Sequence, residues 1–342
     1  MKTPEGALIS RGLRAKPAPI SLRVMRDLVW KTSGLVLFVL SGVLQVTVFV
    51  QAGSTERDWK FPCKQEEIAH YKAYRVRQPI QVDGRLDEEC WRAVPRSPRF
   101  VDMISGKPAL YDTRAALLWD DKYLYVGYWI EEPNVAASLT ERDSLIYTNN
   151  DAELFIAGKD DYYEFEINAL NTIYEVFFIW DDAYEKGGYS AVPEFSRSNP
   201  KVRPFNGVGF TTHPRGGRLG SWAWDFPGLK TAVHVDGTLN NSQDRDKGWT
   251  VELAFPWEGM KWLAKGDGRA LPPKRGDVWR IDFSRFNQYK APPPAEDSGG
   301  WVWSRHGVWD SHIPECFPYI QFSTRDVLDA RQTDGKQTSR VQ

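Results

Sequence analysis

The chain has no surplus of charge of either sign. Its 342 residues include 44 Lys and Arg against 45 Asp and Glu, which gives a net charge of −1. Nucleic-acid-binding domains usually carry a strongly basic patch, so the sequence gives no reason to expect nucleic acid as a partner. Hydrophobic residues make up 42% of the chain and charged residues 26%, a composition that is too apolar for a disordered protein. We therefore expect a folded protein that does not bind nucleic acid.

Methionine, histidine and cysteine are scarce, with four, five and three residues. The histidines are scattered, and the sequence contains neither a phosphate-binding glycine loop nor a nucleophile elbow. The three cysteines match no metal motif, and in an oxidising compartment they allow one disulfide. Because Cys90 precedes Trp91 and has the character of a small core residue, we predict that Cys63 pairs with Cys316.

Aromatic residues, in contrast, are abundant: 15 Trp, 14 Tyr and 17 Phe accompany 27 Gly and 22 Pro. This mixture favours β-structure, where aromatic and β-branched side chains pack well on pleated faces. Helical patterning is weak and is confined to residues 257–264. The sequence predicts an all-β protein, a two-sheet antiparallel β-sandwich of jelly-roll or immunoglobulin-like type. Strand-like runs lie at residues 114–119, 123–130, 152–157, 162–168, 173–180, 231–235, 249–255, 278–286 and 319–322.

One of these runs, residues 162–168, alternates apolar and charged residues as a half-buried strand does. Its Glu164 and Glu166 share one face, at a separation that would suit the paired carboxylates of a glycoside hydrolase. Acidic residues are so numerous in this chain that such a pair arises easily. We therefore expect Glu164 and Glu166 to lie on a solvated strand face.

The first 52 residues differ in character from the rest. They carry seven Lys and Arg against two Asp and Glu, and their basic head is followed by an apolar run and then by small residues. This order is typical of an export signal, although the apolar run is also nearly long enough for an uncleaved membrane anchor. Met25 would give a signal of ordinary length if it were the true start. We expect a secreted, periplasmic or cell-surface protein, in contact with a membrane only if this segment is retained.

The remaining chain divides into three parts. Residues 53–73 are polar and irregular and form a lead-in segment, and residues 74–323 contain the strand pattern without a long polar linker or an internal repeat. Residues 324–342 are polar and are expected to form a flexible tail. One β-sandwich domain over 74–323 is the simplest organisation.

Eight short motifs, in order, resemble family 9 carbohydrate-binding modules. The first, IQVDGRLDEECW at residues 80–91, is similar to the family's opening pattern I-x-x-D-G-x-x-D-E-x-x-W. The others lie at residues 118–126, 150–156, 163–168, 248–252, 256–257, 303–304 and 312–317. The resemblance covers roughly residues 74–323 and implies a jelly-roll sandwich that holds sugar chain ends between aromatic rings and often binds structural calcium.

The resemblance also implies individual site residues. Tyr147 stands six residues before Glu153, where the family has one sandwiching Trp, and Glu153 and Asn168 match positions that contact sugar hydroxyls. The family's arginine two residues before that asparagine is replaced by Glu166, which reverses a charge. The second sandwiching Trp would fall near Ser311, where this chain offers its neighbours Trp309 and His312.

The tryptophans outside the leader fall into two groups. Four in strand-like patterns are expected in the core: Trp91, Trp119, Trp249 and Trp279. Others are candidate ligand contacts, either in Gly- and Pro-rich loops or, for Trp180, at a strand end: Trp180, Trp222, Trp224, Trp301 and Trp309. A flat ring suits the apolar face of a sugar, whereas fixed carboxylates and amides suit its hydroxyls.

Together these observations predict an exported protein that binds a polysaccharide or oligosaccharide and is accessory to polysaccharide breakdown. A glycoside hydrolase, or a component of one, is the first alternative. A haem-binding electron-transfer domain of related fold is the second, disfavoured because only Met103 and Met260 follow the leader as methionine ligands. Calcium is the one cofactor that we expect, and the run Asn149, Asn150 and Asp151 offers oxygen ligands for it.

Overall fold

The computed structural model describes residues 59–289 and 296–338. The predicted export signal or anchor, residues 1–52, lies outside these residues. The described residues all fall within one unit of the chain, Glu56–Gln342. In this part of the chain, no helix is both long and apolar enough to cross a membrane.

Strands account for most of the regular structure, and all nine predicted runs are confirmed as strands. The strands are β1 (His70–Arg75), β2 (Val101–Asp102), β3 (Thr113–Trp119), β4 (Tyr123–Glu131), β5 (Asp151–Ala157), β6 (Asp161–Asn168), β7 (Ile173–Trp180), β8 (Val202–Phe205), β9 (Arg218–Ser221), β10 (Lys230–Asp236), β11 (Gly248–Pro256), β12 (Val278–Phe286), β13 (Gly300–Val302) and β14 (Tyr319–Asp326). The strands that the sequence pattern missed are mainly short: β1, β2, β8, β9 and β13.

Helices are few and short. The α-helices are α1 (Glu89–Ala93), α2 (Lys261–Lys265) and α3 (Val327–Thr338). The 3-10 helices are η1 (Gln65–Glu67), η2 (Ile146–Thr148), η3 (Tyr189–Ala191), η4 (Pro193–Phe195), η5 (Trp257–Met260) and η6 (Pro314–Cys316). The helix predicted over 257–264 is confirmed as η5 followed directly by α2.

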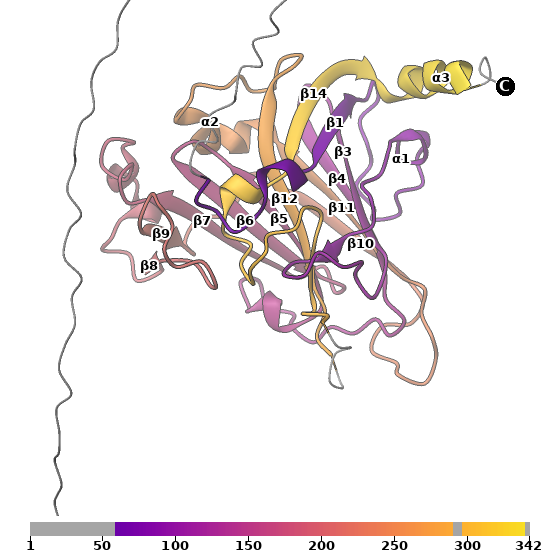
Figure 1. Cartoon of the computed structure of the whole chain (residues 1–342), viewed down its shortest axis with the longest axis horizontal. Coiled ribbons are helices and arrows are strands. Elements are labelled where there is room, and N and C mark those ends of the chain that lie inside the picture. The colour runs from indigo at the N-terminus through magenta and orange to yellow at the C-terminus, as the bar shows by residue number, and fades with distance from the viewer. Residues whose placement is uncertain (1–58, 290–295, 339–342) are drawn as a thin grey trace, which may run out of the picture. The chain divides into compact units, whose positions relative to one another are not determined.

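The strands form one continuous hydrogen-bonded sheet (Figure 1). Its order is β10-β11-β4-β3-β1-β14-β12-β5-β6-β7-β9-β8, with β13 joined to β12 and to β2. The all-β class is therefore confirmed, whereas two separate antiparallel sheets are not. The reason is β1, which pairs in parallel with both β14 and β3 and so links the two halves of the sheet.

The two halves of the sheet face each other across the core. The ring of Phe255 in β11 lies 5.7 Å from that of Phe165 in β6, and Tyr128 in β4 lies 5.9 Å from Phe283 in β12. The four tryptophans predicted in the core are all buried: Trp91, Trp119, Trp249 and Trp279. The aromatic excess of the sequence thus serves largely to fill the space between the two halves.

The opposite face of β5, β6 and β7 is also covered. His312, in the loop that follows β13, packs its ring 5.3 Å from that of Phe155 in β5 and 5.0 Å from that of Phe178 in β7. Glu164 and Glu166 lie on this covered face and are buried. The expectation of a solvated face was therefore wrong, because alternation in a single strand does not show that a distant loop covers its polar side.

Both ends of the described chain are more ordered in secondary structure than the sequence pattern indicates. The lead-in segment contains η1 and most of β1, and its Cys63 forms the predicted disulfide with Cys316, leaving Cys90 as a free thiol. The segment predicted as a flexible tail continues β14 to Asp326 and then forms α3, with Val327 buried.

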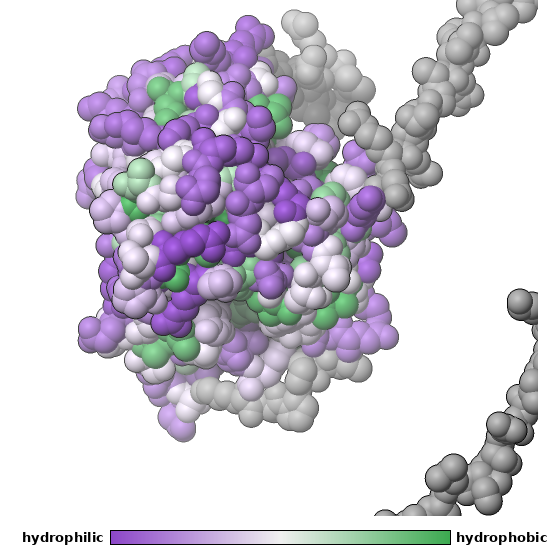
Figure 2. Space-filling view, turned by 90° about the vertical axis from the view of Figure 1, so that its left-hand side faces the viewer, coloured by the Kyte–Doolittle hydropathy of each residue, from purple (hydrophilic) through white to green (hydrophobic). Residues whose placement is uncertain are grey.

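On the side of the unit that carries β8 and β9, the surface coloured in Figure 2 is mostly hydrophilic, with small separate hydrophobic groups.

The opening motif at residues 80–91 has a structural role centred on Glu252 of β11. The buried Glu252 carboxylate accepts hydrogen bonds from the backbone N–H of Asp83 (2.9 Å), that of Gly84 (3.0 Å) and the indole N–H of Trp91 (2.8 Å). Gly84 has a φ of +86°, and a Cβ there would lie 2.7 Å from the carbonyl carbon of Val233. Glycine is therefore required at this turn, and one carboxylate fastens the whole motif to the sheet.

We expect Glu252→Ala to lower the free energy of unfolding by about 2–4 kcal/mol, because it leaves three donors without their acceptor. Urea denaturation followed by tryptophan fluorescence measures the change. Glu258→Ala is the control, since the Glu258 side chain is 84% exposed and should change stability by less than about 0.5 kcal/mol. Equal stability of the two variants would contradict the role assigned to Glu252.

Candidate functional site

A pocket of about 400 Å³ opens on the covered face of β5, β6 and β7. Its wall combines side chains from these strands with others from β8, β12, η2 and the loops that follow β8, β9 and β13. The lining residues are Tyr147, Glu153, Phe155, Glu164, Glu166, Tyr174, Phe178, Phe205, Val208, Trp222, Phe286, Gln288, Trp309, Asp310, Ser311 and His312. The pocket is thus mainly aromatic, with several carboxyl groups.

Strand register brings the carboxyl groups of the floor together. In the antiparallel pair β5–β6, Glu153 lies directly opposite Glu166, and on the other side of β5 it lies opposite Ser284 of β12. Residues directly opposite one another in neighbouring strands point to the same face of a sheet. Glu153 and Glu166 therefore stand side by side on the pocket floor, and Ser284 donates a 2.6 Å hydrogen bond to Glu153 Oε2.

The rim is apolar and open to solvent. Tyr147, Val208 and Trp309 are 43%, 57% and 36% exposed, and all three line the pocket. The Tyr147 ring stands edge-on to Tyr174 at 6.0 Å, and the Trp309 ring stands edge-on to Phe286 at 4.9 Å. Large exposed rings that are held in place beside a pocket are suited to stack on a flat ligand.

Asp310 and His312 shape the part of the wall formed by the loop after β13. Asp310 Oδ2 accepts hydrogen bonds from the backbone N–H groups of Val208 (2.8 Å), Gly209 (3.0 Å) and Phe210 (2.9 Å), which favour its ionised form. Burial lowers the pKa of His312 to about 3, so its imidazole is neutral at ordinary pH. Through its three backbone hydrogen bonds, the Asp310 carboxylate joins the loop after β8 to the loop after β13.

The floor carboxyl groups hold protons more tightly than free acids. Burial raises the pKa of Glu153 to about 8. It also raises the pKa values of Glu164 and Glu166 well above their ordinary range, and the neighbouring Glu153 carboxylate adds to this effect. No hydrogen-bond partner is recorded for Glu166 Oε2, although the residue is buried. The floor thus holds three buried carboxyl groups whose pKa values are raised because they are kept out of water.

The structure brings four of the six predicted site residues into this pocket: Tyr147, Glu153, Trp309 and His312. The other two lie elsewhere, and both are buried. Asn168 Oδ1 accepts hydrogen bonds from the N–H groups of Leu170 (3.0 Å) and Thr172 (3.1 Å), so it stabilises the turn after β6.

Trp180 has its ring faces occupied by protein groups. Its ring centre lies 4.3 Å from that of His213, and the guanidinium of Arg218 lies 4.8 Å from it. Among the loop tryptophans, Trp222 lines the pocket together with Trp309, whereas Trp224 and Trp301 are buried away from it.

The lining residues Tyr174 and Asp310 were missed by the sequence analysis, and Glu164 and Glu166 were assigned to a solvated strand face instead of a site. The register of the β5–β6 hairpin could have placed Glu166 in the site, because a tight turn after residue 157 brings it opposite Glu153. Asp310 gave no such signal, because its partners lie about 100 residues earlier in the chain.

At the run expected to bind calcium, the two amide oxygens and Asp151 Oδ1 already accept hydrogen bonds, whereas Asp151 Oδ2 has no hydrogen-bond partner. Asn149 Oδ1 accepts hydrogen bonds from Ser138 N and Leu139 N, Asn150 Oδ1 from Gln288 N, and Asp151 Oδ1 from Phe286 N. Asp151, Glu153 and Glu166 nevertheless bring one carboxylate oxygen each to within 4.8 Å of one another. Within the described ranges they form the one cluster of three such side chains close enough to share a metal ion. Calcium binding stays a prediction.

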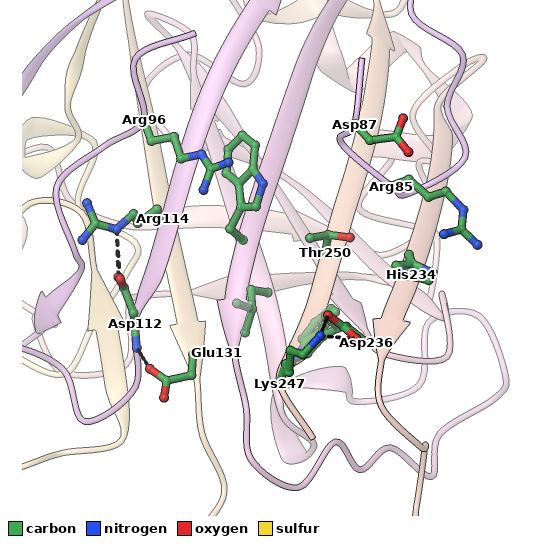
Figure 3. Close-up of a pocket in the computed structure, with 14 residues that line it drawn as sticks. Arg85, Asp87, Arg96, Asp112, Arg114, Glu131, His234, Asp236, Lys247 and Thr250 are labelled. Carbon is green, nitrogen blue, oxygen red and sulfur yellow. Dashed lines mark hydrogen bonds and ion pairs between the residues drawn. The ribbon is translucent and has the colours of Figure 1, made fainter. Parts of the chain in front are cut away.

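A second pocket, of about 480 Å³, lies over β3, β4, β11 and β10 (Figure 3). Its charged groups largely neutralise one another: Arg114 pairs with Asp112, and Lys247 with Asp236, each at 3.0 Å. Arg96 lies 3.8 Å from the centre of the Trp129 ring and covers it. This pocket therefore offers a ligand neither a free aromatic face nor an unbalanced charge.

No protein-family model and no curated protein matches the chain. Among solved structures, the chain is similar to a Bacteroides uniformis protein proposed to bind carbohydrate, with 13% identity, a TM-score of 0.48, and coverage of 75% of this chain and 100% of that one. It is also similar to a family 9 carbohydrate-binding module from Caldicellulosiruptor kristjanssonii, solved with glucose and with cellotriose.

For that module the TM-score is 0.39, and each comparison covers 75% of the present chain. The identities are 14% and 15%, and the shares of the module covered are 97% and 95%. These low values assign no ligand to the present chain.

We expect the ligand-free protein to lose stability as the pH rises from about 4.5 to about 8. In this window the Glu153 carboxyl ionises in the unfolded chain but keeps its proton in the folded one, since its pKa rises from 4.5 to about 8 on folding. Over this range the unfolding free energy of Glu153→Gln should fall less than that of the unchanged protein. The difference between the two falls should be a few kcal/mol, because one pKa unit corresponds to about 1.4 kcal/mol.

Thermal and urea unfolding at pH 5 and pH 8 measure this difference. Glu258→Gln, at an exposed position, should show the same pH dependence as the unchanged protein. If Glu153→Gln also showed the same dependence, Glu153 would not be the protonated group that the structure indicates.

Proposed function

We propose that this chain is a carbohydrate-binding protein and that the pocket beneath Tyr147 and Trp309 holds the end of a saccharide chain. The observation that carries the proposal is the combination of exposed aromatic rings at the rim with a carboxyl floor. Sugars present an apolar face that stacks on aromatic rings and hydroxyl groups that bond to fixed polar groups. The motif resemblance at residues 80–91 and beyond supports the same function independently of the pocket.

The pocket also has the dimensions and chemistry that such a ligand requires. Its volume of about 400 Å³ lies within the usual range of small-molecule sites, about 300–1,000 Å³. The rings of the rim are positioned by other rings rather than by solvent: Trp222 donates a 2.6 Å hydrogen bond to the hydroxyl of Tyr174, which in turn supports Tyr147. Rims held in this way lose little entropy when a ligand binds.

The proposal includes export and a role beside polysaccharide-degrading enzymes. The order of basic, apolar and small residues before residue 53 favours export, and the disulfide Cys63–Cys316 suits an oxidising compartment. Two facing halves of one sheet are compatible with a jelly-roll arrangement. A protein that grips chain ends without cleaving them would hold an enzyme or a cell surface close to its polymer.

The carboxyl floor is the specific observation that favours a second candidate, a glycoside hydrolase. Such enzymes need one protonated carboxylic acid and one ionised carboxylate. Here burial raises the pKa values of Glu153, Glu164 and Glu166 together. The ionised carboxylate in the wall, Asp310, accepts backbone hydrogen bonds at both oxygens, so it is poorly placed to serve as the nucleophile of such a pair. Release of reducing ends from a bound polysaccharide, abolished in Glu153→Gln, would establish hydrolysis.

We expect the protein to retain at least one polysaccharide or oligosaccharide on a glycan array, and Tyr147→Ala and Trp309→Ala each to weaken that binding by about tenfold through loss of stacking. Isothermal titration calorimetry with the best-bound oligosaccharide measures the effect.

Leu145→Ala is the matched control, because Leu145 is an exposed apolar residue next to η2 that does not line the pocket. It should leave the affinity unchanged. The proposal fails if the unchanged protein retains no glycan, or if the control weakens binding as much as the two ring variants do.

A further inference from the structure

The titratable side chains that line the pocket are acidic, apart from one histidine and two tyrosines. Four carboxyl groups line it, from Glu153, Glu164, Glu166 and Asp310, and none of its lining residues is Lys or Arg. The one basic side chain in the lining, His312, is kept neutral by burial, which lowers its pKa to about 3. Arg218 stands behind the wall, where its Nη1 donates a 2.9 Å hydrogen bond to the carbonyl of His312. The lining therefore lacks a positive charge that could face a ligand.

Glu166 provides a second, independent indication. The residue is 1% exposed, lines the pocket, and has no recorded hydrogen-bond partner for Oε2. A buried polar atom without a partner destabilises the protein, and it does so more strongly when it is charged. The position of Glu166, opposite Glu153 on the floor, makes a donor within the pocket the natural partner.

The aromatic wall is a third indication. Aromatic faces attract cations that lie within about 6 Å of the ring centre. In the described part of the chain, guanidinium groups already lie over rings such as those of Trp129, Trp180 and Trp279. Of the rings that line the pocket, only Phe205 has such a partner, the guanidinium of Arg218. Tyr147 and Trp309 are the exposed rings of the lining, and no cation of the protein lies over either in the described part of the chain, so they can receive a cation from a ligand.

We infer that the pocket selects a saccharide whose terminal unit carries a free, positively charged amine, which donates to Glu166 and Glu153 while the sugar ring lies against the aromatic rim. This inference rests on the proposed function, because it names the class of sugar that the same pocket takes. Burial, together with repulsion from neighbouring carboxylates, raises the pKa values of Glu153 and Glu166 in the empty pocket. A ligand ammonium group in the pocket would favour the ionised form of both carboxyl groups.

Three β-1,4-linked trisaccharides that differ only at carbon 2 test the inference: those of glucosamine, of N-acetylglucosamine and of glucose. Each is titrated calorimetrically into the full chain at pH 7 and low salt, with EDTA present to remove metal ions. We expect the glucosamine trimer to bind at least about tenfold more tightly than the two neutral trimers, because a charged hydrogen bond contributes about 1.5–3 kcal/mol.

Glu166→Gln removes the carboxyl group that can ionise opposite an ammonium group, while it keeps the shape of the side chain. It should bring the affinities of the three trimers to within about threefold of one another, mainly by weakening the glucosamine trimer. The matched control is Glu175→Gln, because Glu175 is an equally buried carboxylate on β7 that faces away from the pocket, toward Tyr163 and the N–H of Phe226. This control should keep the preference for the amine, and thermal unfolding of both variants checks their folding.

Several outcomes would overturn the inference. If the glucose trimer binds and the glucosamine trimer binds no better, the pocket takes neutral sugars and the proposed function alone stands. If no trimer and no arrayed glycan binds, the proposed function fails as well. An amine preference that persists in Glu166→Gln would place the amine elsewhere. Calcium chloride, titrated alone without EDTA, is the last probe: binding that depends on Glu166 and blocks the glucosamine trimer would make the floor a metal site instead.

Discussion

The second cover over β5, β6 and β7 is the constraint on which the site depends. One face of these strands packs against β11 and β4, as any half-buried sheet would, but the loops after β8 and β13 close over the other face as well. Side chains that would otherwise stand in water are thereby enclosed among aromatic rings. The raised pKa values of the floor carboxyl groups, the neutral state of His312 and the lack of a hydrogen-bond partner for Glu166 Oε2 all follow from that enclosure.

The sequence predicted the strands better than it predicted what surrounds them. Period-two alternation and turn residues located the longer strands because these signals are local. Strands of two to four residues, such as β2 and β8, carry too little pattern, and the parallel pairing of β1 is a non-local property. For the same reason the polar face of β6 was assigned to solvent: the residues that cover it, such as His312, lie about 150 positions away.

In the candidate site, too, the sequence predicted what local patterns determine and missed what non-local packing determines. The spacing of the resembling motifs located Tyr147 and Glu153, and it located Trp309 and His312 only as neighbours of Ser311, where a second ring was expected. Asn168 follows the pattern in sequence, yet its side chain is committed to the turn after β6. The substitution at Glu166 was visible as a reversed charge, but its place opposite Glu153 could be recognised only once the register of β5 and β6 was known.

The disulfide between Cys63 and Cys316 has a consequence for the pocket that reaches beyond chain stability. Cys316 lies four residues after His312, on the same loop that carries Trp309, so the bond tethers this wall of the pocket to the segment that precedes β1. Reduction of the bond would remove this tether from the wall of the pocket. A chain that folds where thiols stay reduced has the same lining residues but lacks the disulfide that tethers their loop.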